Sequence, residues 1–177
     1  MSYSQGHPIR LVGGRLALDF VNTADWSADG DVVHEKLAGA ADLRLWLAAL
    51  GLTGVRPIAD VADLIGFRCD LRRLLLGGKT LGILNAAQGI HIADGTRLRS
   101  IVAGQPLTSI IAVSAFAILA DKRERDRLKL CPGDNCGWLF LDETKNARRR
   151  WCSMDSCGNR AKAARHYARR KDAQAQS

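Results

Sequence analysis

The sequence predicts a mainly α-helical fold. A helical N-terminal domain, with room for one small β-hairpin, precedes a small C-terminal module built from a hairpin and a helix. Three observations support this prediction. Apolar residues recur at helical spacing through most of residues 1–125, four of the five cysteines lie in the last third, and most of the excess positive charge lies there too. With 47% hydrophobic residues, the 177-residue chain can bury a real core.

The N-terminal domain is expected to span residues 9–127. Its first segment, 16–22, alternates like a strand and also forms a helical stripe, and we favour a short helix. Residues 25–33 contain Gly30 and three aspartates and are expected to form a loop. Longer helices are expected over residues 35–50, 57–76, 81–91 and 110–125.

Turn and capping residues set the expected limits of these helices. Pro57 suits a first helical residue, and Thr80 can cap the helix that follows. Thr108 or Ser109 is expected to cap the helix over 110–125, whose first turns are apolar all round and therefore central. Residues 96–102 alternate and can form the small hairpin with the chain that follows Pro106.

The cysteines of the C-terminal module form two pairs, Cys131-x4-Cys136 and Cys152-x4-Cys157, separated by 15 residues. Each pair contains turn-forming residues, so each short loop can direct two sulfurs toward one point, as in a four-thiolate zinc site. Two disulfides are the alternative, but they need an oxidising compartment, and the N-terminus has no apolar signal segment. An iron–sulfur centre is a second alternative, and zinc is the commoner occupant of a small closed site. We therefore expect one Zn²⁺ per chain.

The residues between the cysteine pairs indicate the shape of the module. Residues 138–141 are apolar and are expected to form a strand, 142–146 a turn, and 148–151 a returning strand. A helix over about 156–172 should follow, capped by Ser153 or Asp155. This arrangement is treble-clef-like, and it spans residues 128–172 with a disordered tail over 173–177.

The predicted C-terminal helix has two faces. Small residues lie on one face, where they would pack against the hairpin and metal, and basic residues lie on the opposite face. A solvated surface is the alternative explanation for the basic face. The small face consists of Cys157, Ala161, Ala164 and Ala168, and the basic face of Lys162, Arg165 and Arg169, with His166 at its edge.

The motif Trp151-Cys152-Ser153-Met154, followed by Cys157-Gly158-Asn159-Arg160, resembles the CGNR zinc finger over residues 130–170. Residues 14–23 and 41–47 resemble the ABATE domain that usually precedes this finger. The members of this family are described as transcription regulators that are induced by stress. The resemblance implies DNA binding by the finger and places zinc on the two cysteine pairs.

Charge is distributed unevenly along the chain. Residues 1–120 hold 11 Lys or Arg and 10 Asp or Glu, a net charge of +1, whereas residues 121–177 hold 15 and 8, a net charge of +7. A basic module beside a near-neutral domain is typical of a nucleic-acid binder, although an acidic protein partner would suit it as well. No apolar run is long enough for a membrane span, so we expect a cytoplasmic protein.

Two functions follow, and we favour the first. In the first, the finger binds DNA while the N-terminal domain senses a small-molecule or protein signal. In the second, the finger is a zinc-stabilised adaptor for an acidic protein and does not bind DNA. An enzyme is not expected, because a closed four-thiolate site leaves no open coordination position. The DNA hypothesis assigns phosphate contacts to Arg148, Arg150, Lys162, Arg165, Arg169 and Arg170, and makes Asn159 and Arg160 either base readers or internal braces.

Polar residues within the first apolar segment are candidates for a second site. Asp19, Asn22 and Thr23 must find partners if they are buried. Bracing of the N-terminal segment is favoured over a ligand pocket. Cys69, within the helix over 57–76, is expected to be a core residue.

Overall fold

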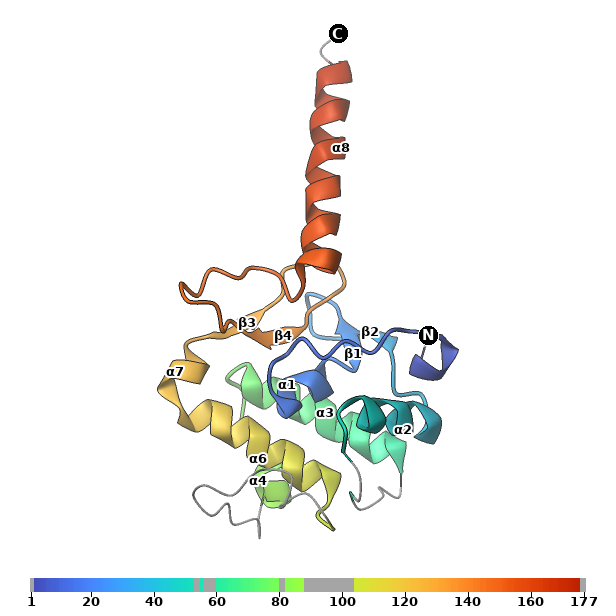
Figure 1. The fold of residues 1–177 in the computed structure, drawn as a ribbon, viewed down its shortest axis with the longest axis vertical. Coiled ribbons are helices and arrows are strands. Elements are labelled where there is room, and N and C mark those ends of the chain that lie inside the picture. The colour runs from blue at the N-terminus through green and yellow to red at the C-terminus, as the bar shows by residue number, and fades with distance from the viewer. Residues whose placement is uncertain (1, 53–54, 56–59, 80–81, 88–103, 176–177) are drawn as a thin grey trace.

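The computed structural model describes residues 2–52, 55, 60–79, 82–87 and 104–175 (Figure 1). Helices and two small antiparallel hairpins form the body, and the last helix projects from it. The mainly α-helical fold class is confirmed. The N-terminal elements are η1 (Tyr3–Gln5), α1 (Leu16–Val21), β1 (Ala24–Trp26), β2 (Val32–Glu35), α2 (Ala40–Ala49), α3 (Val61–Leu75), α4 (Gly82–Ala87), α6 (Leu107–Ala120) and α7 (Lys122–Arg125). The C-terminal elements are β3 (Leu128–Leu130), β4 (Leu139–Leu141), η2 (Met154–Gly158) and α8 (Asn159–Ala175).

Several N-terminal expectations are corrected. The expected loop over 25–33 instead contains most of the β1–β2 hairpin, which has a register shift between Asp25 and Trp26. Glu35 ends β2 rather than starting a helix, because its carboxylate pairs with the buried Arg68. The short helix over 16–22 is confirmed as α1.

The later N-terminal helices also differ in their limits. Asp60 caps α3 by accepting a hydrogen bond from the Ala62 N–H at 2.8 Å, so the helix begins after the expected Pro57. The helix expected from 110 begins at Leu107, and Asp121 interrupts it by capping α7. Residues 56–59, 80–81 and 88–103 lie outside the described residues, and so do the Thr80 cap and the hairpin strand over 96–102. The returning strand expected after Pro106 is wrong, because α6 begins at Leu107.

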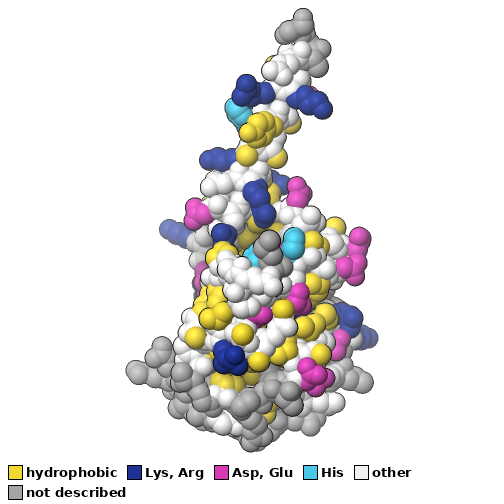
Figure 2. Space-filling view, turned by 90° about the vertical axis from the view of Figure 1, so that its right-hand side faces the viewer, with side chains coloured by type: hydrophobic (Ala, Val, Ile, Leu, Met, Phe, Trp, Pro, Cys, Tyr) yellow, Lys and Arg dark blue, Asp and Glu magenta, His cyan; other side chains and the backbone are white. Residues whose placement is uncertain are grey.

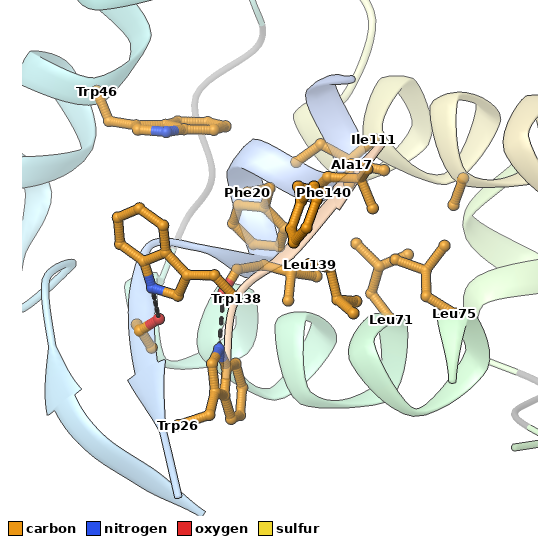
Figure 3. Close-up of a cluster of buried hydrophobic side chains, with 14 of the residues drawn as sticks. Ala17, Phe20, Trp26, Trp46, Leu71, Leu75, Ile111, Trp138, Leu139 and Phe140 are labelled. Carbon is orange, nitrogen blue, oxygen red and sulfur yellow. Dashed lines mark hydrogen bonds between the residues drawn. The ribbon is translucent and has the colours of Figure 1, made fainter. Parts of the chain in front are cut away.

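One hydrophobic core joins the N-terminal elements to the cysteine-rich module. Phe20 from α1, Leu71 from α3 and Ile111 from α6 are each fully buried around Phe140 of β4 (Figure 3). The four cysteines of the two pairs belong to the same cluster. The indole N–H of Trp138 donates to the carbonyl oxygen of Ala24 at 2.9 Å, which ties the start of β4 to β1.

The hairpin of the C-terminal module forms differently from the expectation. β4 pairs with β3, so the hairpin encloses the first cysteine pair and does not use residues 148–151. That segment forms no strand, and side chains hydrogen-bond to backbone groups of Ala147 and Arg149. Lys129 Nζ donates to the carbonyl oxygens of Ala147 and Arg149, and the Arg149 N–H donates to the Asp142 carboxylate. None of the described helices is long and apolar enough to cross a membrane.

Candidate metal centre and nucleic-acid interface

The structure brings the four predicted cysteines together. Their sulfur atoms all lie within 4.8 Å of one another, and all four residues are buried. Cys131 and Cys136 lie in the turn between β3 and β4, Cys152 precedes η2, and Cys157 lies within η2. The Sγ atoms of Cys136 and Cys152 are 3.6 Å apart, and those of Cys152 and Cys157 are 3.7 Å apart.

These separations fit a tetrahedral metal site. A tetrahedron with zinc–sulfur bonds of about 2.3 Å has sulfur–sulfur edges of about 3.8 Å. A disulfide would require about 2.05 Å between sulfurs, so the two predicted pairs are not disulfides here. Four sulfurs converging at this spacing therefore fit one zinc ion.

The buried thiols also need a cation for electrostatic reasons. The pKa of Cys131 is lowered by hydrogen bonds with Cys136 and Cys152, whereas hydrogen bonds with Cys131 raise the pKa of Cys136 and of Cys152. Only part of the set can ionise alone, because thiolates this close repel one another. A divalent cation removes that repulsion and allows all four to become ligands.

The first cysteine loop is shaped by close backbone approach. A Cβ atom on Gly133 would lie 2.9 Å from Cys157 Sγ, so only glycine leaves room for that sulfur. Gly137 has φ +54°, and a Cβ there would lie 2.6 Å from the Trp26 side chain. The loop is thus pressed against the metal position on one side and against β1 on the other.

The helix that follows Cys157 is exposed along most of its length. η2 forms the turn that holds Cys157, and α8 continues from it to Ala175, into the segment 173–177 where a tail was expected. Side chains from Lys162 to Gln174 are all exposed. Ala164 and Ala168 therefore do not pack on the hairpin as expected. Of the small face, Cys157 is buried and Ala161 is half-buried.

The basic residues assigned to DNA lie in two groups. Arg148 and Arg150 are exposed on the loop before Cys152, and the Arg150 guanidinium lies over the Trp151 ring at 4.9 Å. The second group is on α8, where Lys and Arg side chains extend from the projecting helix (Figure 2). It comprises Arg160, Lys162, Arg165, Arg169 and Arg170, with Asn159 at the first position of the helix.

A cleft of about 430 Å³ lies at the base of α8. His7 and Arg10 from the N-terminal segment line one part of it, and Asn159 and Arg160 line another. Arg160 also donates a hydrogen bond from a terminal guanidinium nitrogen to Cys157 Sγ at 3.0 Å, an interaction that raises the arginine's pKa. His7 and Arg10 carry no motif, and the sequence analysis did not identify them.

Comparison with known protein families agrees with this geometry. The sequence profile of the CGNR zinc finger matches residues 127–170, and that of the ABATE domain, described as "Putative stress-induced transcription regulator", matches residues 14–122, more than half of the chain. The chain belongs to the ABATE family. A search of curated proteins found no match. With the converging sulfurs, the match to the CGNR finger assigns one zinc ion per chain to Cys131, Cys136, Cys152 and Cys157.

Within the CGNR finger, Asp142 organises the chain between the cysteine pairs. Its buried carboxylate accepts hydrogen bonds from Lys129 Nζ at 2.6 Å, the Arg149 N–H at 2.7 Å and the Thr144 N–H at 3.1 Å. Burial alone would raise the pKa of Asp142, but these donors hold it well below its usual range. The sequence analysis missed this role, although an acid directly after the apolar residues of β4 was the available signal.

Arg149 differs from its two arginine neighbours. Its guanidinium lies 4.4 Å over the Phe140 ring and donates to the carbonyl oxygens of Trp151 and Val12 at 3.0 and 3.3 Å. Arg149 therefore braces the CGNR finger against the N-terminal segment, whereas Arg148 and Arg150 face outward.

Asp19, Asn22 and Thr23 of the ABATE domain all contact backbone groups of the protein. Asp19 accepts a hydrogen bond from the Gly13 N–H at 2.8 Å, and its burial raises the pKa of the carboxyl to about 6. Asn22 pairs with the backbone of Leu139 through both ends of its amide. Thr23 donates to the Phe20 carbonyl oxygen at 2.7 Å. These contacts favour bracing over the ligand pocket that was the alternative.

Proposed function

We propose that this zinc-binding member of the ABATE family binds double-stranded DNA by placing α8 in the major groove. The observation that carries the proposal is the exposed helix itself. From Asn159 to Ala175 it holds six Lys or Arg residues and a single acid, Asp172. Among the described residues, no carboxylate pairs with Lys162, Arg165 or Arg169.

The dimensions of α8 support this use. A helix of 17 residues is about 25 Å long at about 1.5 Å per residue, and the major groove is about 12 Å wide and admits an α-helix. Unpaired cations on such a helix neutralise phosphates and release counterions. Some basic groups on the body are paired with carboxylates instead, as in the Lys122–Asp126 and Arg73–Asp70 ion pairs.

The CGNR finger would set the direction of the helix. Zinc fixes Cys157 at its base, and the outward-facing Arg148 and Arg150 lie on the adjacent loop, where they can contact phosphates beside the groove. Asn159 lies at the first position of the helix and is the residue of this set best suited to reach a base edge. Arg160 is the exception, because its guanidinium already contacts Cys157.

A salt-titrated binding measurement tests the proposal. The zinc-loaded protein is titrated into a fluorescent random-sequence duplex, and anisotropy is followed at several salt concentrations. We expect binding that weakens steeply with salt, with a slope of about −0.9 in log K against log salt for each phosphate contact. Absence of binding at low salt would contradict the proposal and favour the adaptor for an acidic protein.

A matched pair of charge reversals locates the surface. Arg165→Glu on α8 should weaken binding strongly and reduce the salt slope, whereas Arg44→Glu on α2 makes the same charge change at an exposed position away from the finger. Equal loss of affinity in the two variants would show that only net charge matters. The structural integrity of both variants is checked by their unfolding transitions.

Two further parts of the proposal concern the metal and the N-terminal domain. We infer that the zinc is structural and that the protein is not an enzyme, because four sulfur ligands fill a tetrahedral site. We also infer that a signal received by the ABATE domain would reach α8 through the cleft, since His7, Pro8 and Arg10 line it together with the base of α8. Altered DNA affinity on substitution of His7 would support that route.

A further inference from the structure

The zinc–thiolate cluster carries a charge that the surrounding protein must balance. Four thiolates and one Zn²⁺ sum to −2, and the four cysteines are 1–5% exposed. Buried charge of this kind is unfavourable unless a counter-charge or hydrogen-bond donors lie beside it. A cation next to the sulfurs is therefore expected.

Arg160 is that cation in the described part of the chain. It alone among the Lys and Arg side chains described contacts a cysteine sulfur, at 3.0 Å from Cys157 Sγ. Arg160 follows Cys157 by three residues, so one turn of helix places the guanidinium over the thiolate. Lys36 also lines the cleft, but its ammonium group is paired with Asp25.

Access to the cluster is uneven. The cleft of about 430 Å³ is lined by Cys136, Cys152 and Cys157, whereas Cys131 does not line it. Arg160 lines the same cleft. A small solute that approaches the sulfurs from this side therefore meets the guanidinium beside Cys157.

We propose that Arg160 is the counter-ion of the zinc–thiolate cluster and that it protects Cys157 from small electrophiles that enter the cleft. A hydrogen bond from a guanidinium withdraws electron density from a thiolate, which lowers its nucleophilicity and stabilises the bound form of the ligand set. Arg160 is then a positioning residue of the metal centre rather than a reader of DNA bases. The proposal does not depend on DNA binding.

Alkylation of the zinc-loaded full-length protein by iodoacetamide tests this. Cys157 Sγ attacks the methylene carbon, a carbon–sulfur bond forms, the carbon–iodine bond breaks and iodide leaves. The thioether is a poor ligand, so zinc is released and is detected with a chromogenic chelator, while mass spectrometry maps the modified cysteine. Arg160→Ala should react about tenfold faster than the wild type, with Cys157 modified first, and Arg160→Lys should be intermediate.

Arg148→Ala is the matched control, because Arg148 is exposed on the same finger and contacts no cysteine sulfur among the described residues. It should react at the wild-type rate. Reaction of Arg160→Ala at the wild-type rate, or first modification at Cys131, would overturn the proposal. If Arg160→Ala does not fold, Arg160→Lys decides it: the proposal fails if its rate equals that of the wild type.

A second measurement separates a counter-ion from a general structural role. Zinc affinity, measured by chelator competition, should fall about 10- to 100-fold in Arg160→Ala and less in Arg160→Lys. In the cobalt-substituted proteins the sulfur-to-metal charge-transfer band should shift to lower energy when the hydrogen bond is lost. An unchanged band with unchanged affinity would exclude the role. Duplex binding by Arg160→Lys is measured alongside, so failure of this inference stays distinct from failure of DNA binding.

Discussion

The backbone N–H of Trp26 donates a hydrogen bond to the carbonyl oxygen of the zinc ligand Cys136 at 3.1 Å. Trp26 is 2% exposed, and the guanidinium groups of Arg68 and Arg72 lie 5.5 and 4.6 Å from the centroid of its ring. A metal ligand and the first hairpin of the ABATE domain are therefore parts of one packed unit. Loss of the metal should therefore lower the stability of the ABATE domain as well as that of the finger.

Removal of zinc by a chelator should destabilise the whole protein. The cysteines belong to the core that contains α1, α3 and α6, and a metal that binds only the folded state adds its binding free energy to folding. Far-UV circular dichroism and tryptophan fluorescence should show one coincident transition at a lower temperature, and added zinc should restore it. An ABATE domain that unfolds at an unchanged temperature would contradict this.

Asn22→Ala should destabilise the protein without changing the metal ligands. The side-chain amide donates to the Leu139 carbonyl oxygen at 2.8 Å and accepts from the Leu139 N–H at 2.9 Å, so its loss leaves two buried backbone groups unpaired. We expect a loss of about 2–4 kcal/mol in the free energy of unfolding, measured in urea with saturating zinc. Asn85→Ala, at an exposed position of α4, is the control and should be nearly neutral.

Asp19→Asn should change how stability depends on pH. Burial raises the folded-state pKa of Asp19 from 3.8 to about 6, so the folded protein binds this proton more tightly than the unfolded chain. This group's contribution to stability therefore falls as pH rises from about 4 to about 6, by about 3 kcal/mol at most. The unfolding free energies of the variant and the wild type are measured from pH 4.5 to 7.5. The variant should become more stable relative to the wild type as the pH rises. A difference independent of pH would refute the assignment.

Arg148→Ala and Arg149→Ala should affect different properties although the residues are adjacent. Arg149 contacts the Phe140 ring and backbone carbonyl groups, so its removal should lower stability by about 2–3 kcal/mol. Arg148 faces outward, so its removal should weaken duplex binding and reduce the salt slope by about one while stability is kept. Thermal unfolding and anisotropy on both variants separate the two roles.

The metal centre was predictable because its signal is local. Two short loops, each with turn residues and two cysteines, specify four sulfurs and their convergence with little help from the rest of the chain. The helical elements of the N-terminal domain were predictable for the same reason, since helical spacing is read over neighbouring residues. α1 was recovered even though strand-like alternation competed with it.

Pairing between distant segments was not predictable. Residues 138–141 were expected to pair with 148–151, and no strand was expected over Leu128–Leu130. In the structure Lys129 and Asp142 bond to backbone groups of Ala147 and Arg149, and β3 is the partner of β4. Likewise, helical spacing predicted the small residues on one face of α8. It could not predict that Ala164 and Ala168 of this face would be exposed.

All three residues of β4 are almost fully buried, with Phe140 completely enclosed. Residues 127–170 would therefore carry a bare apolar strand if they were transplanted onto another protein. A self-contained zinc finger can be repeated along a chain. This finger should be transferred between relatives only together with the helices that cover it.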